Sequence, residues 1–190
     1  LDLSGNSNTG TLNNYPAFNT SNNGSLTFNG STNYIDIGKT CTDLGLSSYA
    51  TFDVWIYPTS TGAMYGVSDY GTNGIGMTLR TNSNLSADFY IYPNNYRISY
   101  AYNFAPNNWY NLVGVANSST MYLYLNGQQV ASTTLGNGIG TSSNTLKVGG
   151  RGDLALLGTG NASIVKIYNR ALSAEEILQN FNALRGRYGI

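Results

Sequence analysis

Short runs in which apolar and polar residues alternate recur along most of this chain, separated by clusters of Gly, Asn, Ser and Thr. Alternation with a period of two places successive side chains on opposite faces of a strand. No helical period appears before Ser173, so the pattern indicates a chain built from strands. We predict strands near Leu26–Phe28, Tyr34–Ile37, Thr51–Tyr57, Ala63–Ser68, Ile75–Arg80, Ala87–Tyr92, Tyr96–Tyr102, Trp109–Ala116, Met121–Asn126, Gln128–Thr133, Thr145–Val148 and Ala162–Tyr168.

One helix is predicted at the C-terminal end of the chain. Ser173-Ala-Glu-Glu176 has the spacing of a capping box, in which the serine accepts from a helix N–H and the glutamate accepts from the serine N–H. Ile177, Phe181 and Leu184 then fall on one helical face. We expect this helix to pack across one edge of the strands, as a structural clamp rather than a functional element.

Turn residues punctuate the strands. Asn126-Gly127 separates two strand runs, and both residues tolerate the positive φ that a type I′ hairpin turn requires. Asn13–Asn23 and Gly136–Ser143 are rich in Gly, Asn, Ser and Thr, which indicates loops that could contact a partner. The expected core residues are Trp55, Trp109, Val54 or Ile56, Leu112 or Val113, Leu123, Leu125, Ile164 and Ile167.

Four segments together resemble a known family. They are Asp2–Leu12, Trp109–Ala116, Met121–Gly127 and the strand-to-helix run Ile164–Ile177. This chain resembles the laminin-G-like, concanavalin-A-like lectin and glucanase superfamily, in the form found in bacterial surface proteins and phage structural proteins. The resemblance covers nearly the whole chain. It implies an all-β fold, an antiparallel β-sandwich jelly roll with one short C-terminal α-helix, as a single domain over residues 1–190.

The chain is poor in charge. Only 9% of its residues are charged and its formal net charge is zero, so amides and hydroxyls must supply solubility. Such a surface does not favour nucleic acid or anionic lipid, and no apolar run reaches the length of a membrane span. Cys41 is the single cysteine, which excludes an intrachain disulfide. The composition is typical of extracellular, cell-surface or virion proteins, and a start at Leu1 without Met indicates a processed or excised piece.

Catalysis requires testing, because the resembled superfamily includes retaining glucanases. These enzymes need two carboxyl groups about 5 Å apart. Glu175 and Glu176 are the only glutamates, both are explained by the helix start, and the pattern Glu-x-Asp-x-Glu is absent. There is no histidine, which excludes Ser-His-Asp and Cys-His arrangements. Asp53, Asp69 and Asp88 remain as scattered carboxylates, so we predict that this protein is not an enzyme.

Calcium is the one cofactor that the resemblance suggests. Asp2, Asn6 and Asn8 offer oxygen ligands at alternate positions. Calcium takes six to eight oxygens, often with more than one carboxylate, so Asp36 or Asp153 would have to supply the missing charge. Many members of the resembled superfamily carry an acidic residue at the position of Ser163, so this chain lacks one carboxylate that could bind calcium there. The alternative interpretation of the Asp2 segment is an Asx-rich turn.

Two kinds of short motif have weak functional meaning. Arg151-Gly-Asp153 spells an adhesion tripeptide, although a Gly-containing turn explains it as well. Sequons of the form Asn-x-Ser/Thr are expected by chance in this composition, unless the producing cell glycosylates its exported proteins. They begin at Asn19, Asn23, Asn29, Asn84, Asn117 and Asn161.

Tyrosines alternate with core residues in two strands. If Leu123 and the residues two positions before and after it face the core, Tyr122 and Tyr124 point away from it. The same alternation directs Tyr90 and Tyr92 outward. Outward rings with hydroxyl tips suit contact with a glycan or a neighbouring subunit. The alternative is that one such row lies beneath a loop or the terminal helix.

Two classes of function follow from these patterns. The first is a non-enzymatic structural module of an extracellular fibre, cell surface or virion, which self-assembles into a homo-oligomer or filament through tyrosine-rich surfaces. Its first strand would pair with a neighbouring copy. The second is a carbohydrate-binding, lectin-like adhesion module, with or without calcium. The sequence favours assembly, because few acids are present to build a lectin site and low charge removes repulsion between copies.

Overall fold

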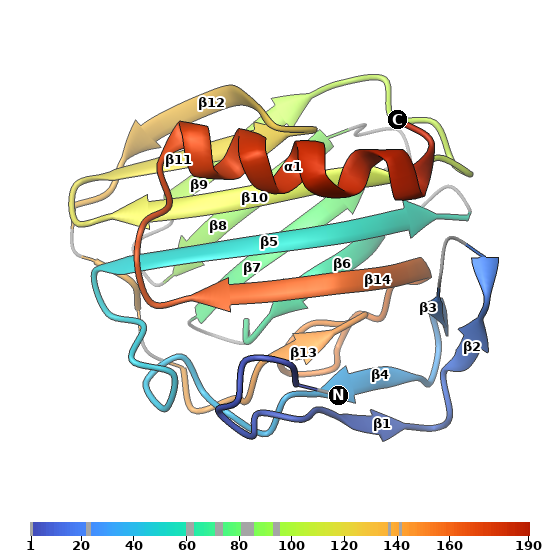
Figure 1. Cartoon of the computed structure of the whole chain (residues 1–190). Helices are drawn as coiled ribbons and strands as arrows, with labels where there is room; N and C mark the ends of the chain where they lie inside the picture. Colours follow the sequence, from blue (N-terminus) through green and yellow to red (C-terminus); the bar gives the residue numbers. More distant parts are fainter. Residues whose placement is uncertain are drawn as a thin grey trace.

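The protein is a sandwich of two antiparallel sheets with one helix laid over the outside of one of them (Figure 1). The computed structural model describes residues 2–21, 24–59, 63–70, 74–80, 86–92, 96–136, 138–140 and 142–190, with the backbone alone at 76–80 and 92. The predicted all-β jelly roll with a short C-terminal α-helix is confirmed. The helix follows directly from the last strand, as the sequence pattern indicated.

The first sheet has the strand order β1-β4-β13-β6-β7-β8-β9. Its neighbouring strands pair antiparallel throughout the described residues. Its strands are β1 (Thr11–Asn13), β4 (Tyr34–Asp36), β6 (Ala63–Ser68), β7 (Gly74–Arg80), β8 (Ser86–Tyr92), β9 (Tyr96–Ala101) and β13 (Lys147–Val148). We call it sheet A.

The second sheet, sheet B, has the strand order β12-β11-β10-β5-β14-β3-β2. Its strands are β2 (Ala17–Asn19), β3 (Ser25–Asn29), β5 (Tyr49–Pro58), β10 (Tyr110–Asn117), β11 (Thr120–Leu125), β12 (Gln128–Thr134) and β14 (Thr159–Tyr168). The long strands β5 and β14 lie side by side at its centre, in front in Figure 1. All of the predicted strands are present, with small shifts at their ends.

The main core lies between the two sheets and follows the alternation in the sequence. Val54 and Ile56 both point into it, as do Leu112 and Leu123. Phe52 and Phe89 meet across it with ring centres 6.4 Å apart. The sequence did not decide whether Leu112 or Val113 would face this core. In the structure Leu112 faces it, and Val113 lies on the other face of sheet B.

A second apolar layer lies on the outer face of sheet B, and it holds residues that we had assigned to the core without specifying a layer. Trp55 and Trp109 are buried there with Phe181 and Tyr188, while Val113 belongs to a neighbouring cluster with Ile177. Strand β5 is therefore covered on both faces. This explains why residues 50–56 are all buried although their side chains alternate in direction.

Helix α1 (Ala174–Tyr188) provides the cover for this outer layer. The predicted capping box is present, since Ser173 Oγ accepts from the Glu176 N–H and the Glu176 carboxylate accepts from the Ser173 N–H. Gly189 closes the helix in the left-handed conformation with φ 74°. The helix packs over the face of sheet B rather than across an edge of the sandwich, which corrects our expectation.

The hairpin between β11 and β12 turns at Asn126-Gly127, with φ 50° and 77° as the type I′ turn requires. Gly127 is also sterically required. A Cβ there would lie 2.9 Å from the Phe181 ring. The turn therefore closes the hairpin and also leaves room for the Phe181 ring of the helix.

The N-terminal region differs from prediction. Strand β1 pairs with β4 of its own chain, in the register Thr11↔Asp36, rather than with a neighbouring copy. The predicted loop from Asn13 to Asn23 contains β2, which pairs with β3. A three-residue strand rich in Asn and Ala carries no readable alternation, so only its partner strand reveals it.

Candidate functional site

The predicted tyrosine contact surface on β11 is not a free surface. Tyr124 does point away from the main core, but it is buried in the cluster beneath the start of α1, and Tyr122 packs partly against the same cluster. The Tyr124 hydroxyl lies 3.3 Å from Gln129 Oε1. The alternative interpretation, a tyrosine row under the terminal helix, describes this strand.

The tyrosines of β8 are similar. Tyr90 points to the outer side of sheet A yet is only 7% exposed, because its ring meets the edge of Tyr70 at 5.4 Å and its hydroxyl lies 3.4 Å from Ser68 Oγ. The side chain of Tyr92 lies outside the described part of the chain. The four tyrosines named from the sequence therefore do not form one exposed patch.

The Asp2 segment has the geometry of an Asx turn. The carboxylate of Asp2 accepts from the N–H groups of Ser4 and Asn8, at 2.9 and 2.8 Å, and from the Ser4 hydroxyl. These hydrogen bonds lower the pKa of Asp2. Among the described residues Asn6 joins the turn through its backbone, since its N–H donates to Ser4 Oγ at 3.2 Å.

The further carboxylates that calcium would need are engaged elsewhere. Asp36 pairs with Lys147 at 2.9 Å, and Asp153 pairs with Arg151 at 2.7 Å. Within the described ranges, no three side chains of His, Cys, Asp or Glu gather in a way that could hold a metal ion. Calcium binding at Asp2 stays a prediction without geometric support.

The Arg151-Gly-Asp153 tripeptide is folded back on itself. Besides its ion pair with Asp153, the Arg151 guanidinium lies 4.4 Å from the centre of the Tyr70 ring. Gly152 is buried, and a Cβ at this position would lie 2.3 Å from the Asp69 backbone. The two charged side chains therefore face each other instead of projecting toward a receptor.

The sequons differ in accessibility. Asn161 is buried, which closes it to an attached glycan, and Asn19 and Asn117 are half-buried. Asn29 is exposed, but its side-chain oxygen accepts from the N–H groups of the following turn. Asn23 and Asn84 lie outside the described residues.

The scattered aspartates do not converge on a catalytic centre. Asp53 lies on the helix-covered outer face of sheet B, whereas Asp88 lies in sheet A, bonded to Arg97 at 2.8 Å. Asp69 is buried between β6 and β7, where its Oδ1 accepts from the Ile75 N–H at 2.6 Å. Burial raises the pKa of Asp69 and of the neighbouring Cys41 thiol. Asp69 therefore has a structural role, because its carboxylate links the end of β6 to the start of β7.

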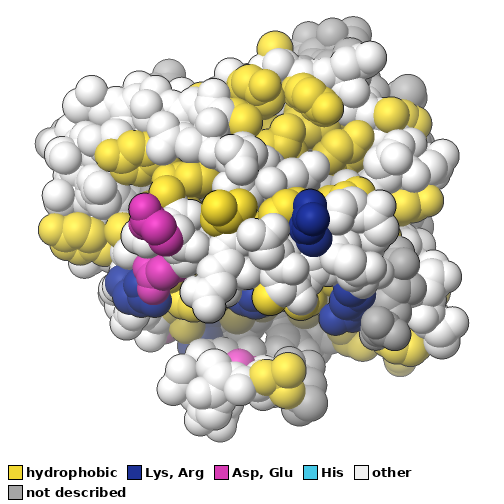
Figure 2. All heavy atoms as spheres, turned by 45° about the horizontal axis from the view of Figure 1, so that its top comes forward, with side chains coloured by type: hydrophobic (Ala, Val, Ile, Leu, Met, Phe, Trp, Pro, Cys, Tyr) yellow, Lys and Arg dark blue, Asp and Glu magenta, His cyan; other side chains and the backbone are white. Residues whose placement is uncertain are grey.

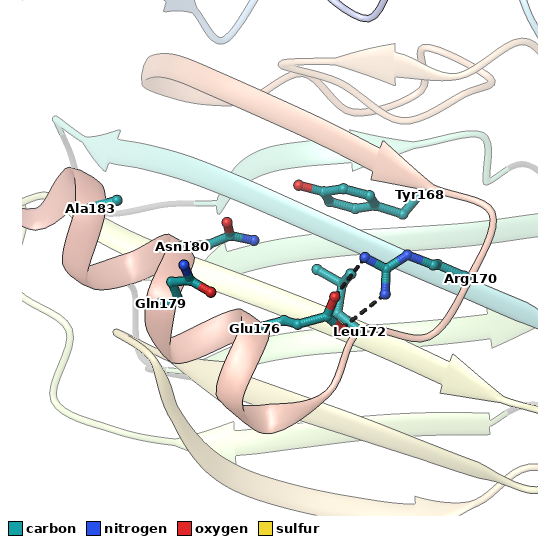
Figure 3. Close-up of a pocket in the computed structure, with 7 residues that line it drawn as sticks. All are labelled: Tyr168, Arg170, Leu172, Glu176, Gln179, Asn180 and Ala183. Carbon is teal, nitrogen blue, oxygen red and sulfur yellow. Dashed lines mark hydrogen bonds and ion pairs between the residues drawn. The ribbon is translucent and has the colours of Figure 1, made fainter.

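A polar groove runs between α1 and the end of β14, with a volume of about 340 Å³ (Figure 3). The half-buried ring of Tyr168 forms one wall, and Asn180 points toward it from the helix. The volume lies at the lower end of the range of ligand sites, about 300–1,000 Å³. The groove is lined by Tyr168, Arg170, Leu172, Glu176, Gln179, Asn180 and Ala183.

The turn that carries Arg170 is fixed from below by one threonine. Thr51 Oγ1, fully buried on β5, donates to the Arg170 carbonyl at 2.8 Å and accepts from the Leu172 N–H at 2.9 Å. The Arg170 guanidinium then bonds both oxygens of Glu176, at 2.7 and 2.9 Å. One end of the groove is thus a rigid, charge-balanced pair.

Two pKa shifts report on the groove. The Arg170 guanidinium, followed by the Ser173 N–H, lowers the pKa of Glu176 to about 2. Burial raises the pKa of the Tyr168 hydroxyl, the Asp53 carboxylate adds to the rise, and a hydrogen bond from Asn180 opposes it. At neutral pH the groove therefore presents a neutral phenol, two amides and an ion pair.

Replacing Arg170 with alanine should raise the pKa of Glu176 toward its ordinary value of about 4.3. A carboxyl group with a lowered pKa in the folded state stabilises the protein above its unfolded pKa and loses that contribution as the pH falls through the folded pKa. The wild-type contribution should therefore disappear between about pH 4.3 and pH 2. NMR titration of the Glu176 carboxyl carbon measures the shift. An unchanged value would mean that the Ser173 N–H alone holds it.

The groove was not predicted from the sequence. Glu176, Gln179, Asn180 and Ala183 follow the spacing of one helical face, which was the only available signal. That face becomes a wall only because α1 lies beside Tyr168. The face drawn in Figure 2 carries few charged side chains: acidic and basic ones lie next to each other at its left, and other basic ones stand apart among uncharged and hydrophobic side chains. No helix in the described residues is long and apolar enough to cross a membrane.

The antiparallel jelly-roll sandwich is the fold of a superfamily that contains both lectins and glucanases. The chain belongs to the concanavalin A-like lectin and glucanase superfamily, whose Laminin_G_3 family profile matches residues 29–178. No curated protein matches the sequence significantly.

Solved structures share the fold at low sequence identity. The binding domain of Paraclostridial Mosquitocidal Protein 1 superposes with a TM-score of 0.74 at 17% identity, over 96% of this chain and 49% of that one. The receptor-binding domain of botulinum neurotoxin C/D mosaic serotype gives 0.71 at 14% identity, over 92% and 46%. A heptameric SAP-like pentraxin from Limulus polyphemus gives 0.59 at 17% identity, over 74% and 71%. The chain thus spans about half the length of the two toxin domains.

Proposed function

We propose that this protein is a carbohydrate-binding module and that the groove between α1 and β14 is a binding site for a short saccharide. The observation that carries the proposal is the composition of the groove. An aromatic ring suits the apolar C–H face of a sugar, while the amides of Gln179 and Asn180 donate to and accept from hydroxyl groups. The ion pair adds charged donors and acceptors without a net charge.

The comparisons support the same class of ligand. The superfamily is lectin-like, and the similar toxin domains are named as receptor-binding domains. Cell entry of botulinum neurotoxin type C is described as dependent on two ganglioside molecules, and the binding domain of botulinum neurotoxin DC has been solved with SialylT. Because identity is below 20%, these names suggest a ligand class for this chain and do not transfer a site.

Self-assembly becomes the second candidate. The sequence analysis expected assembly to proceed through outward tyrosines and through a first strand donated to a neighbouring copy. Tyr90 and Tyr124 are buried, and β1 pairs within its own chain. The heptameric pentraxin keeps oligomer formation open as a proposal for this chain. Light scattering on the purified protein decides it, and a monomer at high concentration would exclude it.

We further propose an extracellular or surface location, in line with the lectin-like superfamily and the toxin receptor-binding domains. We also propose that binding in the groove needs no calcium. The single carboxylate there already accepts from Arg170 and from the Ser173 N–H. Addition of a chelator should leave saccharide affinity and melting temperature unchanged. A loss of either, restored by calcium, would revive the Asp2 hypothesis.

Replacing Tyr168 with alanine should weaken saccharide binding by about tenfold or more, the equivalent of about 1.4 kcal/mol. Loss of the ring removes the stacking wall of the groove. Glycan-array screening first identifies a ligand, and NMR titration then measures the dissociation constant and locates the perturbed residues. We expect the largest shifts at Tyr168, Gln179 and Asn180.

Two further variants separate binding from stability. Tyr168→Phe keeps the ring and should retain most of the affinity, whereas Asn180→Ala should weaken binding with the fold intact, because this half-buried side chain lies beside Tyr168 (Figure 3). Tyr49→Ala, at another exposed aromatic, is the control. Wild-type affinity in both Tyr168→Ala and Asn180→Ala would exclude the groove as the site.

A further inference from the structure

The corner where the chain passes from β1 to β2 exposes more aromatic surface than any other described segment. Tyr15 is 92% exposed and Phe18 is 69% exposed, and Leu12 on β1 is 48% exposed. Soluble proteins leave single apolar side chains exposed without consequence, but two strongly exposed rings three residues apart in the chain point to a contact surface. We call Tyr15 and Phe18 the aromatic corner.

The backbone holds this corner in a fixed and unfavourable conformation. Asn14 and Tyr15 have φ values of 52° and 51°, which bulky residues rarely adopt. Tyr15 also precedes Pro16, which is buried. The Asn14 amide donates to the Thr32 carbonyl at 2.8 Å and fixes the turn from outside. Strained backbone at an exposed ring is typical of functional sites, where it organises a contact in advance.

Phe18 is positioned by its strand. It pairs with Leu26, whose side chain reaches the main core, so the ring of Phe18 extends the inner layer of sheet B to the rim of the sandwich. Gly24 lies against one part of this ring, since a Cβ at Gly24 would be 3.0 Å from it. Most of the ring faces solvent, and the position of the ring is set by β2.

The chain segment that forms the corner is uncharged, and one basic side chain reaches it from the helix, since Arg187 donates to the Gly24 carbonyl at 3.3 Å. No Asp, Glu, Lys or Arg occurs from Leu3 to Ile35. The neighbouring polar groups are the amides and hydroxyls of residues such as Asn13, Asn19 and Thr20. A surface with so little charge attracts a charged polymer only weakly, and its hydrogen-bonding groups match the hydroxyls of an uncharged one.

The size of the corner argues against a protein partner. Aromatic side chains bury about 150–250 Å² each when they are covered completely, so these partly exposed rings with Leu12 offer roughly 400 Å². A stable protein interface needs about 800 Å² from each partner. Stacking on a few sugar rings needs only the area that the corner provides.

We propose that the aromatic corner is a stacking platform for an uncharged polysaccharide chain, separate from the groove. This inference shares its ligand class with the proposed function but uses different residues at a different end of sheet B. In Figure 1 the β2 edge and the C-terminal end of β14 lie on opposite sides of the molecule. Two contacts on one module would bind a multivalent glycan surface more tightly than either contact alone.

Affinity electrophoresis in native gels tests the platform. The gels contain dextran, galactomannan or laminarin as uncharged polymers and polygalacturonate as the charged comparison. We expect at least one uncharged polymer to retard the wild-type chain. The double variant Tyr15→Ala and Phe18→Ala should bind the polymer about tenfold or more weakly and therefore run with little or no retardation. The Tyr49→Ala variant should be retarded like the wild type. Raising the salt concentration should change little, because the two aromatic rings that make the contact carry no charge.

The outcomes distinguish the two proposals. If the double variant Tyr15→Ala and Phe18→Ala is no longer retarded but still binds short saccharides in the groove at Tyr168, both the groove and the platform are supported. Unchanged retardation in the double variant overturns the platform, and its loss in Tyr168→Ala would then assign the polymer to the groove. Failure of every uncharged polymer to retard the wild type also overturns it. Concentration-dependent dimers that the double variant abolishes would make the corner a protein interface instead.

Discussion

Phe181→Ala is expected to lower the free energy of unfolding by about 3–5 kcal/mol, the larger of two strong destabilising effects that we predict. The Phe181 ring lies flat against Trp55, with ring centres 5.8 Å apart and planes within 6°. Trp55 is fully buried and also stacks on Tyr188 at 4.1 Å. Removing the phenyl group leaves a cavity beneath the helix that the rigid sheet cannot fill.

Urea denaturation followed by tryptophan fluorescence measures this loss, because Trp55 and Trp109 both lie under the helix. Leu178→Ala on the same helix is the matched control, since Leu178 is 39% exposed and its replacement should cost well under half as much. Equal effects of the two substitutions would mean that Phe181 is not a packing residue. We would then expect the apolar face of the helix to dock on a partner protein instead.

Asp53→Ala should destabilise the protein by about 2–4 kcal/mol, the second largest effect. The Asp53 carboxylate is 2% exposed and bridges two strands. Its Oδ1 accepts from the buried Asn111 amide at 2.7 Å, and its Oδ2 lies 3.6 Å from Lys166 Nζ. Truncation leaves a buried amide donor and a lysine without their common acceptor, and the penalty comes from those orphaned groups.

Asp53→Asn separates shape from charge. Burial raises the pKa of Asp53, and Lys166 and Asn111 oppose the shift without cancelling it. An acid with a raised pKa in the folded state costs stability as the pH rises through its unfolded and then its folded pKa. The asparagine variant should therefore lose less stability than alanine at neutral pH, and its deficit relative to the wild type should shrink as the pH rises through the two pKa values of Asp53. Identical unfolding curves for Asp53→Ala and Asp53→Asn would contradict this account.

These two residues also link stability to the proposed site. Asp53 is among the charges that raise the pKa of Tyr168, and α1 supplies one wall of the groove. A variant that loosens the helix should therefore weaken saccharide binding indirectly. Binding assays on Phe181→Ala and Asp53→Ala need measured folded fractions before their affinities are compared with those of Tyr168→Ala.

The sequence by itself determined the local elements. Alternation located the strands, the spacing from Ser173 to Glu176 located the helix start, and Asn126-Gly127 located a hairpin, because each signal depends on residues close in the chain. The family also followed from sequence, since its strand and helix patterns are contiguous. The direction of Tyr124 away from the main core was readable for the same reason.

Only the tertiary structure decided what covers each outward face. The burial of Tyr124 and Trp55 depends on where α1 lies, which the helix sequence does not state. The groove joins a strand end with a helix face, and the aromatic corner depends on the pairing of β1 and β2 with partners far along the chain. Periodicity tells which way a side chain points, whereas exposure depends on the element that arrives above it, and that element is chosen by the packing of the whole chain.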